Sequence, residues 1–264
     1  MKKYLVIGNP INHSLSPKLH NHWIKMNNIS AIYEKKKLDN VELKNLIEKI
    51  KEKKIDGINV TVPFKKEVIS FIDNLSPEAK NTQSVNTICL NNNKVFGHNT
   101  DIDGFKNAIK EINFDIKDKK IFILGAGGVV PSIIFALYEM KVSKIIVSNR
   151  TKDKAESLKK LFKDLTIINW GEIPSFDMII NATSVGLKKE DKIDLDFSKI
   201  DNQKFFYDVI YNPSETNFLK TAKELGNNIE NGKKMFIFQA AAAFKIWHGI
   251  NPEIDKEVYK LLDQ

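Results

Sequence analysis

Residues 58–65, INVTVPFK, place a lysine where an apolar, strand-like pattern ends. Isoleucine and valine alternate with polar residues and run into Pro63, which is followed by Phe64 and Lys65. A lysine held at the end of a strand can act as a general acid–base group where its site is desolvated, because desolvation makes the ammonium release its proton more readily. The alternative is a surface salt bridge, because a second lysine, Lys66, follows directly.

A glycine-rich stretch, GAGG at 125–128, lies between a predicted strand and a predicted helix. In that context glycines permit a tight turn and let backbone N–H groups approach a pyrophosphate, whose charge the helix N-terminus favours. The third position of the dinucleotide fingerprint is Val130 instead of Gly or Ala, and Pro131 follows it. We expect Val130 to push the helix slightly away from the strand. The alternative for an isolated match is a plain strand-to-helix turn.

The chain contains 40 lysines but a single arginine, Arg150. It lies between Asn149 and Thr151, directly after the predicted strand KIIVS and about 20 residues beyond the glycine loop, where an NAD site carries an acidic residue for the ribose. A planar guanidinium can bind a phosphate through two hydrogen bonds, and Lys154 supplies a second cation nearby. Cations in place of the acidic residue predict NADP as the cofactor.

The segment GNPINHSLSPKLHNH at 8–22 carries two serines in a predicted loop. We expect Ser16 to be the N-cap of a helix that has Pro17 as its first residue, which leaves Ser14 free to bind a ligand. Capping alone explains Ser16 as well as ligand binding does. The three histidines of this segment have no second ligand cluster to complete a coordination sphere, so no metal is expected.

Composition narrows the classes of function. The chain has 264 residues and a net charge of +8, but its lysines are scattered and alternate with acidic residues, which is typical of a solvated surface and not of a nucleic-acid site. The lone Cys89 excludes an internal disulfide and fits a reducing compartment. Neither MKKYLVIGNP nor MFIFQAAAAF is a long enough apolar run for a secretory signal or a membrane span. We expect a cytoplasmic protein without nucleic-acid or membrane partners, either a monomer or a homodimer.

Strand-like runs alternate with amphipathic helical patterns along the whole chain, so the predicted fold class is α/β. Runs that are apolar throughout, such as IFIL at 121–124, are typical of parallel strands covered on both faces. The charged turn DIKDKK before IFILGAGG indicates that a second domain starts near 115–125. The predicted strands are 4–8, 31–35, 57–62, 84–90, 120–124, 144–148, 166–169, 178–181 and 205–209. The predicted helices are 16–27, 41–53, 104–112, 128–140, 153–163, 215–225, 234–248 and 253–262.

These motifs together resemble the shikimate dehydrogenase family along essentially the whole chain. The matching segments, in family order and spacing, are GNPINHSLSPKLHN (8–21), GINVTVPFK (57–65), VNTI (85–88), GHNTDIDG (97–104), GAGG (125–128), NRTKDKA (149–155), NATSVG (181–186), DVIYNP (208–213) and NGKKMFIFQAAAAFKIWHG (231–249). The resemblance implies an α/β substrate-binding domain made of residues 1–103 and 238–264 and a Rossmann-type NADP-binding domain of residues 104–237, with the active site in the cleft between them. It also implies reversible NADPH-dependent reduction of 3-dehydroshikimate to shikimate, in the pathway to aromatic amino acids.

The resemblance also implies roles for single residues. Lys65 matches the family's catalytic lysine and Asp101 its partner, and we expect the two to titrate as a unit. The residues expected to bind the substrate are Ser14 and Ser16 at its carboxylate, Thr61, Asn86, Asp101 and Gln239 at its ring hydroxyls, and Tyr211. Gln239 is the one polar residue in MFIFQAAAAF, and a buried amide needs a partner, which is either a ligand or the protein itself.

The residues expected to bind the cofactor are Gly125, Ala126, Gly127 and Gly128 in the glycine loop, Asn149, Arg150, Thr151 and Lys154 after the next strand, and Thr183, Val209, Gly232 and Met235 near the nicotinamide. Departures from the family pattern occur at Val129, Val130, Pro131 and Lys234. Lys234 replaces a glycine, and we expect it to alter cofactor affinity or to add a charge there.

Two alternatives stay open. A broader quinate/shikimate enzyme would resemble this chain, although such forms tend to carry an acidic residue after the second strand and to use NAD. A non-catalytic NADPH-binding sensor would keep the fold, but it would not need a proton carrier such as Lys65 with Asp101.

Overall fold

The computed structural model describes residues 1–263, apart from the side chain of Asn40, and divides into two compact units. The first unit comprises Met1–Gly104 together with the segment that starts at Ile237, and the second comprises Phe105–Phe236. The division falls one residue from the bounds implied by the resemblance, 1–103 with 238–264 and 104–237. Both boundaries lie inside helices, namely α4 (Asp101–Glu111) and α8 (Lys233–His248).

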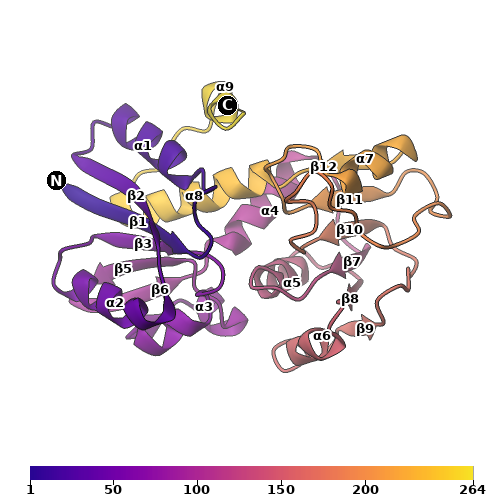
Figure 1. Cartoon of the computed structure of the whole chain (residues 1–264), viewed down its shortest axis with the longest axis horizontal. Coiled ribbons are helices and arrows are strands. Elements are labelled where there is room, and N and C mark those ends of the chain that lie inside the picture. Colours follow the sequence, from indigo (N-terminus) through magenta and orange to yellow (C-terminus); the bar gives the residue numbers. More distant parts are fainter. Residues whose placement is uncertain (264) are drawn as a thin grey trace. The chain divides into compact units, whose positions relative to one another are not determined.

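The first unit contains a mixed six-stranded sheet with strand order β2-β1-β3-β5-β6-β4 (Figure 1). Strand β1 is parallel to β2 and β3, whereas β5 is antiparallel to both β3 and β6. Its strands are β1 (Lys2–Gly8), β2 (Ala31–Lys37), β3 (Gly57–Val60), β4 (Asn74–Leu75), β5 (Thr87–Asn91) and β6 (Lys94–His98). Its helical elements are α1 (Ser16–Met26), η1 (Asn40–Glu42), α2 (Leu43–Lys51), η2 (Glu67–Phe71), α3 (Pro77–Thr82), most of α8, and α9 (Lys256–Leu261).

Alternate residues of β1 enter two different cores, because side chains along a strand point to opposite faces. Leu5 and Ile7 belong to one apolar cluster with Ile47 of α2. Tyr4 points the other way and contacts Trp247 of α8 with 4.9 Å between ring centroids. The sheet is therefore covered on both faces, by α2 on one side and by α1 and α8 on the other (Figure 1).

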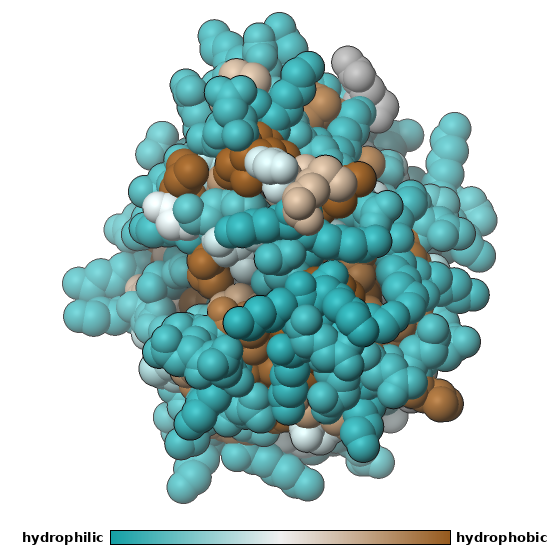
Figure 2. Space-filling model, turned by 90° about the vertical axis from the view of Figure 1, so that its left-hand side faces the viewer, coloured by the Kyte–Doolittle hydropathy of each residue, from teal (hydrophilic) through white to brown (hydrophobic). Residues whose placement is uncertain are grey.

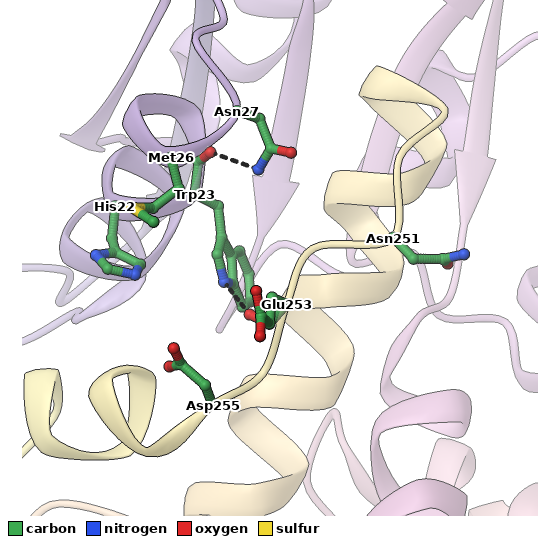
Figure 3. Close-up of a pocket in the computed structure, with 7 residues that line it drawn as sticks. All are labelled: His22, Trp23, Met26, Asn27, Asn251, Glu253 and Asp255. Atoms are coloured by element: carbon green, nitrogen blue, oxygen red, sulfur yellow. Dashed lines mark hydrogen bonds between the residues drawn. The ribbon is translucent and has the colours of Figure 1, made fainter.

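The chain after α8 crosses α1 and then forms α9. The indole N–H of Trp23 donates to the backbone carbonyl of Glu253 at 2.9 Å, as Figure 3 shows. Asp255 caps α9, because its Oδ1 accepts from the backbone N–H of Val258 at 3.0 Å. This C-terminal segment is thus attached to the first unit by a side-chain hydrogen bond and begins its last helix with a capping carboxylate.

The second unit contains a six-stranded, fully parallel sheet with strand order β12-β11-β10-β7-β8-β9 (Figure 1). Numbered from β7, this is the order of the dinucleotide-binding Rossmann fold, so the expected α/β architecture is confirmed. Its strands are β7 (Lys120–Leu124), β8 (Lys144–Ser148), β9 (Thr166–Ile168), β10 (Met178–Asn181), β11 (Phe205–Asp208) and β12 (Asn228–Glu230). Besides most of α4, its helices are α5 (Val130–Glu139), α6 (Lys152–Leu158) and α7 (Asn217–Glu224). Phe122, Phe206 and Phe218 pack together in its core.

Several predicted bounds are wrong. The strand predicted at 57–62 ends at Val60, and the one predicted at 84–90 begins only at Thr87. Between these two strands the backbone N–H of Val85 donates to the carbonyl of Lys65. Residues 84–86 therefore contact the turn that carries Lys65, and the strand begins only after them. The helix predicted at 41–53 has η1 as its first turn and becomes α-helical at Leu43, and the one predicted at 153–163 ends at Leu158.

The surface of the protein is rich in lysines that pair with acidic residues. Figure 2 shows a face on which hydrophilic residues dominate and hydrophobic ones are scattered among them. Lys3 pairs with Glu34 at 2.7 Å and Lys54 with Glu52 at 2.8 Å, and both pairs are solvent-exposed. Within residues 1–263 none of the helices combines the length and the apolar character needed to cross a membrane.

Candidate functional site

Lys65 lies in a turn that follows β3, not at the end of the strand as the sequence pattern predicted. The backbone N–H of Thr61 still donates to Ile7 in the manner of the sheet, and then Phe64 donates to the Thr61 carbonyl at 3.0 Å to close the turn. The side chain of Phe64 is buried in the core, and the carbonyl of Lys65 accepts from Val85 at 2.8 Å. A buried anchor and a backbone hydrogen bond therefore fix the position of Lys65.

Lys65 and Asp101 form an ion pair with 2.6 Å between Nζ and Oδ2. Their side chains are only 12% and 7% exposed, so the pair is not the surface salt bridge that stood as the alternative. Asp101 is the first residue of α4, where the partial positive charge of the helix N-terminus favours a carboxylate. Asn99 orients this end of the helix, because its Oδ1 accepts from the Asp101 N–H at 3.2 Å.

Asn86 connects this ion pair to other polar groups. Its Nδ2 donates to Asp101 Oδ1 at 2.8 Å and to Thr100 Oγ1 at 2.9 Å, and lies 3.5 Å from Oε1 of Gln239. Its Oδ1 accepts from the Thr100 N–H at 2.8 Å, which fixes the orientation of the amide. The predicted residues Lys65, Asp101, Asn86 and Gln239 thus lie in one cluster, and Gln239 has the polar partner that its position required.

A chain of buried side chains continues from Asn86 to Ser16. Thr87 Oγ1 donates to Asn86 Oδ1 at 3.0 Å and accepts from Asn59 Nδ2 at 3.0 Å. The hydroxyl of Tyr33 donates to Asn59 Oδ1 at 2.6 Å and is itself hydrogen-bonded by Ser16. Sequence reasoning missed Tyr33, Asn59 and Thr87, although Asn59 is a polar residue at the centre of the apolar stretch INVTV.

The expected role of Ser16 as the N-cap of the helix is wrong. Ser16 is already the first residue of α1, and Leu15 occupies the N-cap without a side-chain hydrogen bond. Ser14 satisfies the free helix N–H instead, because its Oγ accepts from the backbone N–H of Ser16 at 3.3 Å. Ser16 is buried at 7% exposure, which directs its hydroxyl to Tyr33. Thr61, the remaining expected substrate residue of this unit, lies at the end of β3 against Gly8 of β1.

The expected cofactor residues of the second unit follow the carboxyl ends of its parallel strands. The glycine loop follows β7, Asn149–Thr151 follow β8, and Thr183 follows β10. Val209 and Tyr211 follow β11, and Gly232 follows β12. Because the carboxyl ends of parallel strands share one edge of the sheet, these segments lie along the edge where nucleotides bind in such folds.

Two glycines at this edge are required by close approach of the backbone. Gly125 has a φ of +111°, and a Cβ there would lie 2.8 Å from the carbonyl oxygen of Ala182. A Cβ on Gly232 would lie 2.1 Å from the carbonyl oxygen of Val209. Gly127 is not crowded in this way, so space remains beside it for a ligand. The loop therefore fits a pyrophosphate at the start of α5, where Val130 is completely buried and donates its N–H to Gly127.

The residues after β8 present an exposed cation. Asn149 Nδ2 donates to the Thr151 carbonyl at 2.7 Å and so closes the turn that carries Arg150. Arg150 and Lys154 are exposed, whereas the Lys152 ammonium is held by Asn169 at 2.8 Å. Within the described part of the chain Arg150 forms no ion pair, so its guanidinium is available to an anionic ligand.

The unusual Lys234 is paired with an acidic residue. Its Nζ lies 2.6 Å from Oε2 of Glu230, the last residue of β12, and both side chains are mostly buried. Its charge is therefore compensated within the unit. Met235 beside it is buried, and the ring of Tyr211 stacks on Phe236 with centroids 4.4 Å apart.

A separate depression of about 240 Å³ lies beside α1 and contains none of the expected site residues (Figure 3). Its lining includes the carboxylates of Glu253 and Asp255, but Asp255 already caps α9. Among residues 1–263 no group of three or more His, Cys, Asp or Glu side chains is arranged to hold a metal ion.

Comparisons with known proteins match both parts of the chain. Residues 6–88 match the family model of the shikimate dehydrogenase substrate binding domain, and residues 107–211 match that of shikimate / quinate 5-dehydrogenase. A curated shikimate dehydrogenase (NADP(+)) from Pelagibacter ubique is 59% identical over 262 residues, which cover 99% of both chains.

Solved structures agree with these matches. The crystal structure of shikimate dehydrogenase from Aquifex aeolicus has a TM-score of 0.92 at 38% identity and covers 100% of this chain and 98% of that one. Shikimate 5-dehydrogenase from Thermus thermophilus, solved in complex with NADP(H) and shikimate, has a TM-score of 0.89 at 30% identity, with coverage of 100% and 98%. With both family models matched in order and similarity along the whole chain, this protein belongs to the shikimate dehydrogenase family.

Proposed function

We propose that this protein is an NADP-dependent shikimate dehydrogenase that catalyses the reversible reduction of 3-dehydroshikimate to shikimate. The observation that carries the proposal is the buried Lys65–Asp101 pair, at 2.6 Å, joined to Asn86 and Gln239 in the unit whose sequence matches a substrate-binding domain. Binding alone does not require a desolvated ammonium beside a carboxylate, whereas proton transfer does. The names of the relatives support the same activity.

The substrate presents a carboxylate and ring hydroxyls, and the first unit offers partners for both. The hydroxyls of Ser14 and Ser16 near the start of α1 would bind the carboxylate. Asn86, Asp101, Gln239 and Thr61 would bind the ring oxygens, since together they supply both donors and acceptors. Tyr211, from the second unit, is the remaining residue that we assign to the substrate.

The second unit fits NADP at the edge described above. Gly125, Ala126, Gly127 and Gly128 would receive the pyrophosphate, and Arg150 with Lys154, Asn149 and Thr151 would receive the 2′-phosphate. Thr183, Val209, Gly232 and Met235 would line the nicotinamide region. When bound, NADPH supplies the hydride for the reduction.

Lys65 would manage the proton that accompanies the hydride. Reduction of a ketone creates an alkoxide, and the Lys65 ammonium can protonate it, while in the reverse direction the neutral amine accepts the hydroxyl proton. Asp101 holds Nζ in place through Oδ2 and stabilises the charged form of the lysine.

The deciding experiment mixes the protein with shikimate and either NADP⁺ or NAD⁺ and follows reduced nicotinamide by its absorbance. We expect turnover with NADP⁺ to exceed turnover with NAD⁺ clearly. A flat trace with both cofactors would overturn the enzymatic proposal and favour an NADPH-binding sensor. Quinate in place of shikimate tests the broader quinate/shikimate activity, which the second family model leaves open.

We also propose a cytoplasmic location and a monomeric or homodimeric state. The free Cys89 fits a reducing compartment. Cell fractionation and light scattering would test the two statements separately, and an assembly larger than a dimer in solution would contradict the second.

A further inference from the structure

Asn181 and Asp208 end two neighbouring strands of the second unit, β10 and β11, and are direct register partners. Both side chains are completely buried. They lie at the sheet edge that carries the proposed cofactor residues, yet neither is assigned a role in binding or in proton transfer. A buried carboxylate is costly unless its surroundings compensate it, so its contacts indicate what it does.

Asp208 accepts three hydrogen bonds and contacts no cation among the residues that the structure describes. Its Oδ1 accepts from the backbone N–H of Ile210 at 3.0 Å and from Asn181 Nδ2 at 3.1 Å. Its Oδ2 accepts from the hydroxyl of Thr216 at 2.6 Å, and Thr216 is the N-cap residue of α7. One carboxylate thus holds the loop after β11, the end of β10 and the start of α7.

Asn181 passes this constraint on to Thr183. Its Nδ2 donates to Asp208 and to the Val185 carbonyl at 3.1 Å, and its Oδ1 accepts from the Thr183 N–H at 3.1 Å and from the Thr183 hydroxyl at 2.7 Å. A flipped amide would turn its oxygen toward the Asp208 carboxylate and its NH₂ toward the Thr183 N–H, and both contacts would be repulsive. Asp208 therefore determines the orientation of the Asn181 amide and, through it, the loop at Thr183.

The same two residues connect three consecutive loops at this edge. The backbone N–H of Val209 donates to the Asn181 carbonyl at 3.0 Å, and that of Gly232 donates to the Ile210 carbonyl at 3.0 Å. A shift at the Asn181–Asp208 pair would therefore move Thr183, Val209 and Gly232 together.

We propose that Asp208, acting through Asn181, is a positioning residue that holds the loops after β10 and β11 for the nicotinamide half of NADP. The inference rests on the proposed function, because it is the proposed NADP site that gives these loops a ligand. It predicts that loss of the carboxylate lowers the affinity for the nicotinamide half of NADP and leaves the affinity for the adenosine half unchanged.

The test measures dissociation constants by calorimetry with two probes, NADP⁺ and ADP-ribose 2′-phosphate, which lacks the nicotinamide. For Asp208→Ala we expect the constant for NADP⁺ to rise about tenfold, as for the loss of one or two hydrogen bonds, while that for ADP-ribose 2′-phosphate changes by less than about twofold. Equal weakening of both probes would mean general damage to the unit and would overturn the proposal.

Asp208→Asn provides the conservative rescue. Its amide oxygen can still accept from Ile210 and Asn181, and its NH₂ can donate to Thr216, so we expect NADP⁺ affinity within about threefold of the wild type. If this variant binds NADP⁺ as poorly as Asp208→Ala while folded by circular dichroism, positioning by geometry is refuted. Because it preserves the hydrogen bonds, it keeps the test valid even if Asp208→Ala does not fold.

Asn181→Ala should reproduce the loss, and the Asn181→Ala/Asp208→Ala double variant should bind NADP⁺ no worse than either single variant, because the two act in series. Additive losses would contradict the proposal.

Asp177→Ala is the matched control. Asp177 precedes β10 at the opposite end of the strand and accepts from the Lys120 N–H at 2.8 Å, so we expect unchanged affinity for both probes. If the wild type binds neither probe, the proposed function fails; if it binds both and Asp208→Ala matches it, only the positioning role fails.

Discussion

Trp247 of α8 donates its indole N–H to the backbone carbonyl of Ile88 in β5 at 3.1 Å, across 159 residues of sequence. Gly57 makes this approach possible, because a Cβ there would lie 2.3 Å from the indole nitrogen. The same helix carries Gln239, whose Oε1 lies 3.5 Å from Asn86 Nδ2. Anchoring the end of α8 on the sheet therefore also sets where Gln239 meets the polar cluster around Lys65.

Trp247→Phe should separate this anchoring role from simple packing. The phenyl ring keeps most of the aromatic contacts but cannot donate to the Ile88 carbonyl, which keeps its place opposite Ile58 in the sheet, so the free energy of unfolding should fall by about 0.5–1.5 kcal/mol. The Michaelis constant for shikimate should rise, while the dissociation constant of NADP⁺ stays unchanged. Denaturant titration and initial-rate kinetics measure these quantities.

Trp23→Phe is the control for that prediction. Trp23 is also buried and also donates to a backbone carbonyl, that of Glu253, but it lies on α1 and does not hold α8 to β5. We expect it to lower stability without raising the Michaelis constant for shikimate. The same rise in both variants would show that the Trp247–Ile88 bond has no particular effect on Gln239.

Lys65→Met should remove the proton carrier and keep much of the apolar stem. We expect kcat to fall by about 10²–10⁴, the usual contribution of general acid–base catalysis, whereas shikimate binding is affected less. Stopped-flow kinetics together with calorimetric binding of shikimate would show this split. Lys66→Met, which changes the neighbouring exposed lysine, should leave kcat near the wild-type value. A Lys65→Met enzyme with nearly unchanged turnover is incompatible with the assigned role.

The sequence predicted the second unit better than the first, and the lengths of the apolar runs explain the difference. Strands 120–124, 144–148 and 178–181 match β7, β8 and β10 residue for residue, since each is a continuous apolar run that ends at a polar residue or a glycine. The elements β4, β6, β12 and α3 were not predicted, because they are short and none of them contains a continuous apolar run of the kind that marks β7, β8 and β10. For α3 a local signal did exist, since Ser76 precedes Pro77 and caps the helix.

The candidate site, too, could be predicted from the sequence only in part. Lys65 and Asp101 were expected from the motifs, and the structure places their charged groups in contact. The chain from Thr87 through Asn59 to Tyr33 was not expected, because it joins residues 26 to 28 positions apart across three strands. Such pairings depend on sheet order, which the spacing of single motifs does not contain.

Arg150→Gln should change the choice of cofactor more than the chemistry. The variant loses the proposed bidentate, charge-assisted hydrogen bonds to the 2′-phosphate. The Michaelis constant for NADP⁺ should therefore rise roughly 10- to 100-fold, while that for NAD⁺ changes little. Initial rates with each cofactor measure the ratio. Lys152→Gln is the control, because the Lys152 ammonium is already engaged by Asn169 and should not contact the phosphate. An equal loss for both cofactors would show that Arg150 does not read the phosphate.

His20 should make the first unit sensitive to acid. The ring is 1% exposed, stacks on Tyr33 with centroids 4.3 Å apart, and has no hydrogen-bond partner for either nitrogen among the described residues. Burial, with a smaller contribution from nearby His248, lowers the pKa of His20 to about 3. The unfolded chain binds the proton near pH 6.5 and the folded one does not, so stability is lost as the pH falls from about 6.5 toward 3.

His20→Phe should remove this loss, because phenylalanine keeps the aromatic stack and cannot bind a proton. Relative to the variant, the wild type should lose about 1.4 kcal/mol of unfolding free energy for each pH unit below 6.5. The difference between the two proteins is the quantity to measure, by urea titration from pH 7 to pH 4.5. Burial raises the pKa of Asp208 to about 6, so protonation of Asp208 stabilises the folded state as the pH falls. This contribution is the same in both proteins and cancels in the difference. The control is His13→Phe, which changes an exposed histidine and should leave the dependence of unfolding free energy on pH as in the wild type. Parallel curves for the wild type and His20→Phe would show that His20 binds its proton equally well in the folded and the unfolded chain.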